Sequence, residues 1–297
     1  NIDIAAVKTK DWSFNFGFNI SQNKNEILEL PENKNDELYT FGNKNYAYSV
    51  MMGDPLGSFY GYRYKGVYQN VEETYAVNTS GQRILDIDGN PVVMKNGDQK
   101  VYPGDARYED VNGDGVIDEN DIVYLGNSNP TLTGGLNFTL RYKKVSLVAA
   151  FHGRAGQKVI NQARMDMENM RGKNNQSVAV LRRWRSEGDD TDIPRALYDK
   201  GYNYLGSDRF VEDASFLRLK TVTLKYQMPA KWMKAIGVNK LELYATGYDM
   251  FVWTKYKGQD PEVNLKAAND GTVAQVAIDS NNTPKPFKIA FGLNLNF

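Results

Sequence analysis

The feature that most constrains this chain is the length of its alternating segments, in which apolar and polar residues take turns over ten or more positions. In WSFNFGFNIS, residues 12–21, every second residue is aromatic or Ile, and the others are Ser, Asn or Gly. The last segment, FKIAFGLNLNF, residues 287–297, repeats this pattern. Because successive side chains of a β-strand point to opposite faces, a period of two predicts strands with one apolar and one polar face.

The length of these strands favours a membrane over a soluble sheet. Eleven residues at about 3.3 Å each, tilted by about 45°, span roughly 25 Å, which is the height of the apolar band of an outer-membrane barrel. Strands of soluble sandwiches are usually about half as long. The sequence therefore predicts an all-β fold, a transmembrane antiparallel β-barrel, and a soluble β-sandwich with one apolar face is the alternative. Aromatic residues gather at the strand ends, as in a membrane-interface girdle: Trp12, Tyr142, Tyr226, Trp253 and Tyr256.

Composition excludes several classes of function. The 36 basic and 36 acidic residues cancel, which removes the electrostatic case for a nucleic-acid partner. The chain has no cysteine and one histidine, His152, so zinc sites and Ser–His catalysis are hard to build. We expect His152 to be an interfacial or luminal polar residue. No carboxylate pair, nucleophile or phosphate loop has a recognisable context, and we predict that the chain is not an enzyme.

Seven segments are long enough to cross a membrane, and their connections are unequal. They cover residues 2–8, 11–23, 131–142, 145–153, 210–228, 241–256 and 286–297. Residues 143–144 predict a tight hairpin. A change of phase between Leu219 and Val222 predicts either a β-bulge or a strand that leaves the lipid zone at this point. The connections at 24–130, 154–209 and 257–285 are long and polar. Bacterial outer-membrane barrels have this asymmetry, with short periplasmic turns and long extracellular loops.

The count of seven strands predicts that the chain is the C-terminal part of a larger barrel. Single-chain bacterial barrels have an even number of strands. An open sheet edge in hydrocarbon costs several kcal/mol for each unsatisfied backbone group. The chain also opens with NIDIAAVKTK, without a Met or a signal peptide. The structural alternative is a small autonomous porin or adhesin barrel, closed by an eighth strand within residues 58–69, which alternate too.

The acidic stretch DVNGDGVIDEND, residues 110–121, predicts a calcium loop. Its spacing fits the D-x-N-x-D-G pattern, with Gly115 at the sharp turn. A structural Ca²⁺ would pin a long loop, and its binding would be weakened because the twelfth position is Asp rather than the longer Glu. The alternative is a set of tight turns held by Asx hydrogen bonds. The predicted ligands are Asp110, Asn112, Asp114, the Val116 carbonyl, Asp118 and Asp121.

A second loop holds weaker candidates for substrate contact. Residues 177–188 predict a short helix, and within it Arg183 and Trp184 could contact an anionic or sugar substrate. Tyr202 and Tyr204 could stack on sugars in the same loop. In both cases the alternative is structural: a solvated helix face with one buried Trp, and tyrosines that pack the core of the loop itself.

Three runs of sequence resemble the SusC/RagA family of TonB-dependent outer-membrane transporters near its C-terminus. They are DVNGDGVIDENDIVYLGNSNPTLTGGLNFTL at 110–140, FVEDASFLRLKTVTLKYQMP at 210–229 and LYATGYDMFVWTKYKGQDPEV at 243–263. The ending GLNLNF is similar to the terminal strand of that family, whose last aromatic residue is the assembly signal; here that residue is Phe297. The similarity covers most of residues 53–297.

The resemblance implies a 22-strand barrel of the bacterial outer membrane, of the Bacteroidetes type, of which about seven strands lie here. It implies a plug and further barrel strands on an N-terminal segment, TonB acting through that segment, and a SusD-like surface lipoprotein as lid. The imported nutrient would be an oligosaccharide or a peptide, and outer-membrane lipid would surround the wall. The plug and the TonB-contacting segment are absent from these 297 residues. An alternative of another class is a secreted, calcium-stabilised glycan-binding β-protein.

Overall fold

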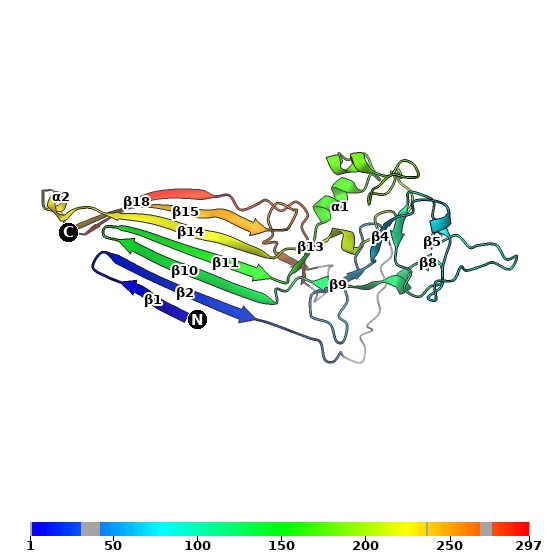
Figure 1. Ribbon diagram of the computed structural model, residues 1–297, viewed down its shortest axis with the longest axis horizontal. Coiled ribbons are helices and arrows are strands. Elements are labelled where there is room, and N and C mark those ends of the chain that lie inside the picture. The colour runs from blue at the N-terminus through cyan, green and yellow to red at the C-terminus, as the bar shows by residue number, and fades with distance from the viewer. Residues whose placement is uncertain (1, 31–41, 236, 268–274, 297) are drawn as a thin grey trace.

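The computed structural model contains one long antiparallel sheet and one lobe of loops (Figure 1). It describes residues 2–30, 42–235, 237–267 and 275–296. The sheet has seven strands in the order β1-β2-β10-β11-β14-β15-β18, and every neighbouring pair is antiparallel. Their bounds are β1 Ile2–Lys8, β2 Trp12–Gln22, β10 Leu132–Tyr142, β11 Val145–Ala155, β14 Phe216–Gln227, β15 Lys240–Thr254 and β18 Lys288–Asn296. Each of the seven predicted segments contains one of these strands, but the segment predicted at 210–228 joins the sheet only from Phe216 onward, because Val211–Asp213 forms β13 and pairs with β12 in the lobe.

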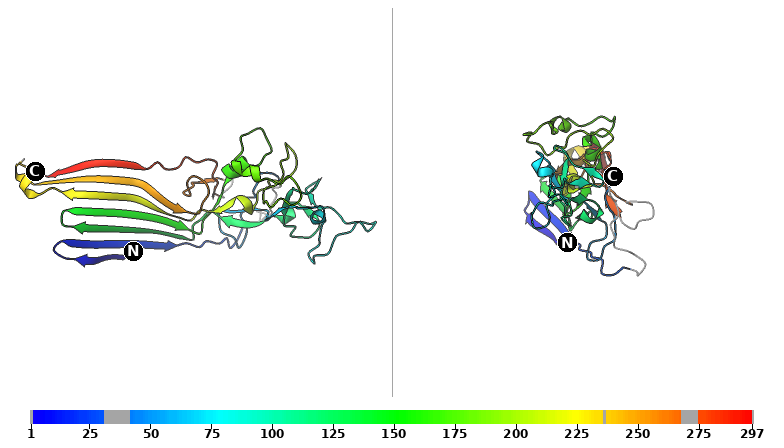
Figure 2. Two further views of the ribbon diagram at one scale, coloured as in Figure 1. Left: turned by 45° about the horizontal axis from the view of Figure 1, so that its top comes forward. Right: turned by 90° about the vertical axis from the view of Figure 1, so that its right-hand side faces the viewer.

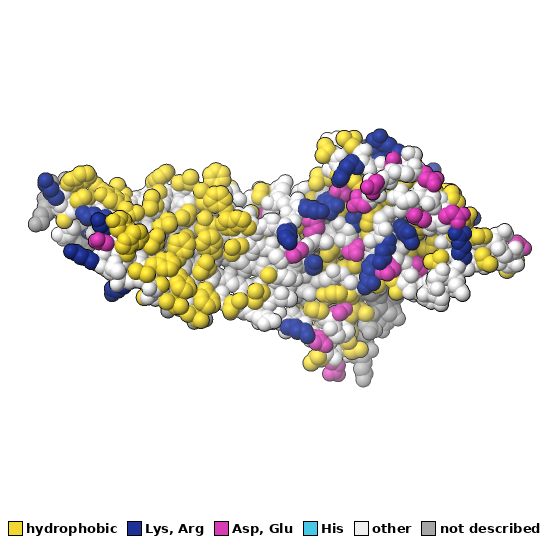
Figure 3. Space-filling view, in the orientation of Figure 1, with side chains coloured by type: hydrophobic (Ala, Val, Ile, Leu, Met, Phe, Trp, Pro, Cys, Tyr) yellow, Lys and Arg dark blue, Asp and Glu magenta, His cyan; other side chains and the backbone are white. Residues whose placement is uncertain are grey.

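The register of the sheet places the apolar residues of every long strand on one face. Leu224 of β14 lies opposite Leu147 of β11 and Ala245 of β15, and Ala245 lies opposite Phe291 of β18. The next row along the strands is mainly polar: it contains Thr246, Thr223, Thr139 and Asn15, with Val148 between the threonines of β14 and β10. Figure 3 shows the apolar face as a nearly continuous hydrophobic band, whereas the charged side chains gather on the lobe.

The predicted bulge is confirmed at Lys220. Along β14 the pairing with β11 passes from Leu219 to Thr221, so that Lys220 has no partner in the ladder. The pairing with β15 skips the same residue. An extra residue reverses which side chains face which side, and this explains why Leu219 and Val222 share a face despite their different parity.

The sheet is open at both sides in the described part of the chain. There β1 pairs only with β2, and β18 pairs only with β15, and Figure 2 shows the two strands at opposite edges. The barrel prediction is therefore confirmed as far as a seven-stranded antiparallel sheet. The alternative of a small barrel closed by an eighth strand within residues 58–69 is not supported, because these residues contain β3 (Ser58–Gly61) and β4 (Tyr64–Val67), which pair within the lobe and not with the sheet. Their tyrosines pack a local core instead.

Short turns lie at one end of the sheet and the lobe at the other (Figure 1). The β10–β11 hairpin turns at Lys143 and Lys144, and Lys143 adopts the left-handed φ of 49° that such a turn requires. Helix α2, Ala230–Ala235, joins β14 to β15 at the same end. None of the described helices is long and apolar enough to cross a membrane.

The three long connections fold together into the lobe, which contains its own short elements. Three two-stranded pairings join β3 to β9, β4 to β7 and β12 to β13; a fourth joins β16 to β17, and β6-β5-β8 forms a three-stranded sheet. Helix α1, Gln162–Glu168, follows β12 directly. The remaining bounds are β5 Lys95–Asn96, β6 Gln99–Lys100, β7 Ala106–Tyr108, β8 Val116–Ile117, β9 Val123–Asn127, β12 Lys158–Ile160, β13 Val211–Asp213, β16 Leu265–Ala267 and β17 Gln275–Ala277, with short 3-10 helices at Glu72–Thr74, Glu119–Asp121, Val178–Arg182 and Asp208–Phe210.

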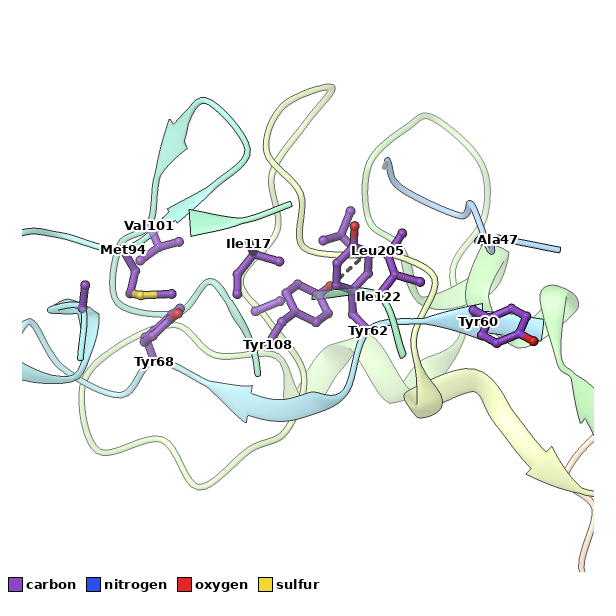
Figure 4. Packing of buried hydrophobic residues seen from close by; sticks show 12 residues of the cluster. Ala47, Tyr60, Tyr62, Tyr68, Met94, Val101, Tyr108, Ile117, Ile122 and Leu205 are labelled. Carbon is purple, nitrogen blue, oxygen red and sulfur yellow. Dashed lines mark hydrogen bonds between the residues drawn. The ribbon is translucent and has the colours of Figure 1, made fainter. Parts of the chain in front are cut away.

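The largest hydrophobic core of the described residues lies in the lobe and is rich in tyrosine. Tyr62, Tyr68 and Tyr108 pack with Ile117 and Leu205, as Figure 4 shows. Leu205 comes from the second long connection and the other four residues from the first, so this core joins two loops that are far apart in sequence. Buried tyrosines usually place the hydroxyl on a partner. Tyr108 does so by accepting the backbone N–H of Leu205 at 3.0 Å.

Candidate functional site

The acidic loop is held by hydrogen bonds from its own backbone. One oxygen of Asp110 accepts the N–H of Gly113 at 2.7 Å and that of Asp114 at 3.3 Å, and the other accepts the N–H of Gly115 at 2.8 Å. Gly113 and Gly115 both adopt positive φ, 72° and 86°. Such conformations favour glycine, so the two glycines allow the chain to wrap around one carboxylate.

Asp121 closes the loop from inside the lobe. Its carboxylate is fully buried and accepts the N–H of Val111 at 2.7 Å and that of Asp118 at 3.0 Å. Burial raises the pKa of Asp121 above its ordinary value, although the two backbone donors favour the charged form. The side chain of Asp118 accepts the N–H of Asn120 at 2.8 Å. Asp118 and Asp121 together form a capping box at the start of the 3-10 helix Glu119–Asp121.

These contacts match the alternative of Asx-type turns. No group of three or more His, Asp or Glu side chains in the described ranges is arranged to hold a metal ion. Asn112 turns its amide nitrogen toward Asp114, at 2.9 Å, and its amide oxygen accepts the Asp114 N–H at 3.1 Å. Each carboxylate oxygen has a second lone pair, so backbone bonds alone do not preclude a cation. The calcium site stays a prediction.

The acidic loop is fastened to the core of the lobe. Ile117 is fully buried in the tyrosine cluster, and β8, which contains it, pairs in parallel with β5. Tyr62 donates its hydroxyl to the carbonyl of Asp118 at 3.0 Å. A bond from a buried hydroxyl fixes the loop to β-structure that precedes it by more than fifty residues, so its order does not depend on local turns alone.

Trp184, one of the predicted substrate residues, packs inside the lobe. Gly104 has a φ of +87°, and a Cβ built on it would lie 2.2 Å from the indole of Trp184. The ring therefore covers a glycine that no other residue could replace without a shift. Trp184 also donates its backbone N–H to Ile193 at 2.9 Å. Of the predicted helical segment 177–188, only Val178–Arg182 forms a helix, and it is a 3-10 helix. Arg183 follows it directly, is half-buried and donates its guanidinium to the Val180 carbonyl at 3.4 Å.

The two predicted tyrosines have different surroundings. Tyr204 is 3% exposed, and its ring lies 6.4 Å from that of Phe210 in a second core cluster, where a dissolved ligand cannot reach it. Arg209 lies 5.7 Å above the same ring, in a cation–π contact. Tyr202 is half-buried, and its hydroxyl donates to Asp98 Oδ1 at 3.5 Å. Of the four predicted substrate residues, Tyr202 is the one that lines a pocket described below.

A pocket of about 180 Å³ opens in the lobe beside Tyr202. Tyr102, 57% exposed, lies on its rim, and Arg195 lies 5.6 Å above that ring. Arg195 also makes a bidentate ion pair with buried Asp105, at 2.7 and 3.0 Å. Tyr102, Asp105 and Arg195 could not be predicted as a site from the sequence, because no local pattern connects Asp105 with Arg195, which are 90 positions apart. An aromatic ring beside a neutralised ion pair can contact sugar rings or peptide side chains.

An ion-pair cluster, which no sequence pattern predicts, lies where the polar face of the sheet meets the lobe. Arg218 of β14 is 3% exposed and pairs with Asp260 at 2.5 Å and with Glu262 at 3.4 Å. Glu262 also pairs with Lys220, the bulge residue, at 3.3 Å and with Lys285 at 2.6 Å. Burial alone would raise the pKa of Glu262, but Lys285 and Lys220 outweigh it and lower the pKa. The cluster ties the connection after β15 to the sheet wall.

Together, an open sheet of membrane-length strands with one apolar and one polar face and a large lobe at one end are the arrangement found in part of an outer-membrane-type β-barrel wall. The comparisons with known proteins give its relatives. The chain is 32% identical over its whole length to the TonB-dependent receptor P26 of Formosa agariphila, of which it covers 28%. It is 26% identical to the TonB-dependent receptor SusC of Bacteroides thetaiotaomicron, again over its whole length and 26% of the relative.

Solved structures share the fold. The chain superposes on the RagAB peptide importer in its closed-closed state with a TM-score of 0.67 and 24% identity, over 99% of this chain and 28% of the other. A further structure of the RagAB peptide transporter gives a TM-score of 0.68 at 23% identity, with the same coverage. No family model matches the chain.

The chain is thus homologous along its full length to a portion of the SusC/RagA-type TonB-dependent receptors. It spans about 28% of the length of the first of these curated relatives. The curated relatives are described as TonB-dependent receptors and the structural relatives as a peptide importer or transporter, in agreement with the prediction that the chain is not an enzyme. The homology implies an outer-membrane location. The predicted assembly signal, Phe297, lies outside the described residues.

Proposed function

We propose that this chain forms the C-terminal part of the wall and the extracellular lobe of a TonB-dependent nutrient importer in the outer membrane of a Bacteroidetes-type bacterium. The remaining strands and a plug would lie on an N-terminal segment, through which TonB acts. A SusD-like surface lipoprotein would cover the lobe. The substrate would be an oligosaccharide or a peptide; the structural relatives import peptides, as their descriptions state.

The observation that carries the proposal is the exposed apolar face of the sheet. Phe291 is 82% exposed, Ile20 65% and Ile289 55%, and no layer of the described residues covers that face. A water-soluble sandwich buries such a face against a second sheet. The same strands present Thr, Asn and charged residues on their other face, which is the arrangement of a barrel wall between lipid and a polar lumen.

The lobe supports an extracellular role for the long connections. It lies at the opposite end of the sheet from the short turns (Figure 2), as extracellular loops lie opposite periplasmic turns. The ion-pair cluster of Arg218, Asp260 and Glu262 holds one of these connections against the polar face of the wall. Loops fixed in this way can present a defined surface to a substrate or to a lid protein.

Fractionation of the native cells tests this function. The polypeptide that contains this chain is expected in the outer-membrane fraction after a high-salt wash, to require detergent for extraction, and to co-purify with a surface lipoprotein. A barrel is also expected to migrate faster on SDS gels before boiling than after it. Recovery of the chain as a detergent-free, folded, secreted protein would refute the proposal and favour the glycan-binding alternative.

A further inference from the structure

The apolar face of the sheet contains a recess at the end nearer the lobe. It has a volume of about 310 Å³, and Ile20, Leu136 and Leu217 are among the residues that line it, together with Gly134 and Gly153. The register explains its origin, because Gly134 pairs with Ile20 on one side and with Gly153 on the other, and Gly153 pairs with Leu217. Two large side chains therefore flank two adjacent positions that have none.

Backbone conformation does not require glycine at either position. Neither Gly134 nor Gly153 is among the residues with positive φ. A Cβ at Gly153 would lie 3.1 Å from the carbonyl oxygen of Phe216 and 3.4 Å from Leu217 Cδ1, which is tight but within reach of a small shift. Glycine in a strand interior weakens the strand and often marks a place where a ligand approaches the backbone.

We propose that this recess binds one acyl chain of an outer-membrane lipid. The recess is continuous with the apolar face that meets hydrocarbon under the proposed function, on which this inference rests. Between the recess and the lobe, the exposed residues Gln22 and Lys24 are polar. The side chains of these residues would lie near the headgroup of a lipid whose acyl chain occupies the recess. Lipid tails are as apolar as Leu, so the preference over bulk lipid comes from close packing against small residues.

Fluorescence quenching by a lipid with brominated acyl chains tests the site. Trp253 reports on the recess, because it lies opposite Leu217 on β15, and Trp12 reports on the far end of the same face. The whole protein, purified in detergent, is titrated with brominated phosphatidylethanolamine. The share of each tryptophan is obtained by subtracting the signal of the Trp253→Phe or Trp12→Phe variant. We expect saturable quenching of Trp253 and unsaturable quenching of Trp12 in proportion to the brominated fraction.

Variants then separate the recess from general lipid contact. Gly153→Leu fills the recess and is expected to abolish the saturable part of the Trp253 quenching. If this variant does not assemble, Gly153→Ala replaces it in the experiment and is expected to weaken the saturable quenching. Ala245→Leu adds similar bulk to the same face away from the recess and is expected to leave the saturable part intact. Quenching of Trp253 that matches that of Trp12, or that survives Gly153→Leu, would overturn the inference.

Two further outcomes have distinct meanings. If Trp12 is quenched while Trp253 is fully protected, a protein segment rather than a lipid occupies the recess, and the inference fails while the proposed function stands. If neither tryptophan is quenched, the apolar face does not meet lipid, and the membrane placement itself is wrong.

Discussion

A charge placed at the middle of the apolar face gives the sharpest test of the orientation of the sheet. Ile289 and Ala290 are adjacent on β18, so their side chains point to opposite faces. Ile289 lies opposite Gly247, and through it shares a row with Val222, Ala149, Phe138 and Phe16, midway between the two ends of the hydrophobic band. Ala290 lies opposite Thr246 on the polar face.

The Ile289→Arg variant is expected to destabilise the assembled protein strongly, whereas Ala290→Arg is not. Arg at the bilayer midplane on the lipid face of a barrel costs about 2–4 kcal/mol, and this corresponds to a change of roughly 30- to 1,000-fold in the unfolding equilibrium. Arg on the polar face meets water, and surface changes of that kind are usually within about 0.5 kcal/mol.

The assay is guanidinium unfolding of the whole protein in lipid vesicles, followed by the shift between the unboiled and boiled bands on SDS gels. Ala290→Arg is the matched control, because it adds the same side chain to the same strand one position away. Equal losses in the two variants would show that the strand edge is simply intolerant of Arg. A larger loss for Ala290→Arg would reverse the assignment of the faces and refute the reasoning.

Three further predictions concern the lobe. Asp260→Asn removes the carboxylate that pairs with Arg218 and leaves a buried guanidinium undercompensated, at a cost of about 3–5 kcal/mol; limited proteolysis is then expected to cleave the connection after β15 faster, and unchanged cleavage would contradict the anchoring role. Gly104→Ala forces a Cβ into the Trp184 indole at positive φ, and a fall in stability of more than about 1 kcal/mol is expected from chemical denaturation; a neutral effect would show that the indole moves freely. If the acidic loop binds calcium, chelation with EGTA is expected to speed proteolysis within residues 105–126, and unchanged cleavage there would favour the Asx turns alone.

The sheet could be predicted from sequence because its determinants are local. A period of two over eleven residues, as in β2 and β10, predicts both the strand and the residues on each of its faces, and no partner strand needs to be known. The bulge at Lys220 was visible for the same reason, as a change of phase within one strand. The eighth strand that the small-barrel alternative requires does not form, because residues 58–69 break into two four-residue strands, β3 and β4, which pair with β9 and β7 in the lobe.

The lobe could not be predicted in the same way, because its contacts are remote in sequence. Asp105 and Arg195 are 90 residues apart, and Arg218 and Asp260 are 42 apart, and neither pair leaves a periodic trace. The role of Tyr204 could not be predicted from its residue type. An aromatic residue in a polar loop can stack on a ligand or pack in a local core, and the packing of Tyr204 against Phe210 shows that it belongs to a core.

The sheet and the lobe are stabilised by different interactions, and an ion-pair cluster at their junction connects them. None of the core clusters among the described residues lies on a face of the sheet, so under the proposed function the order of the sheet rests on backbone hydrogen bonds and on lipid around its apolar face. The lobe instead buries tyrosines and aliphatic residues as a water-soluble domain does.

At the junction, Arg218 belongs to the wall, and its partners Asp260 and Glu262 belong to the lobe. Because lysines lower the pKa of Glu262, its share of this attachment is present at neutral pH and is lost as pH falls through that lowered pKa. Acid should therefore loosen the connection after β15 from the wall before it disturbs the strand ladder, whose hydrogen bonds do not titrate.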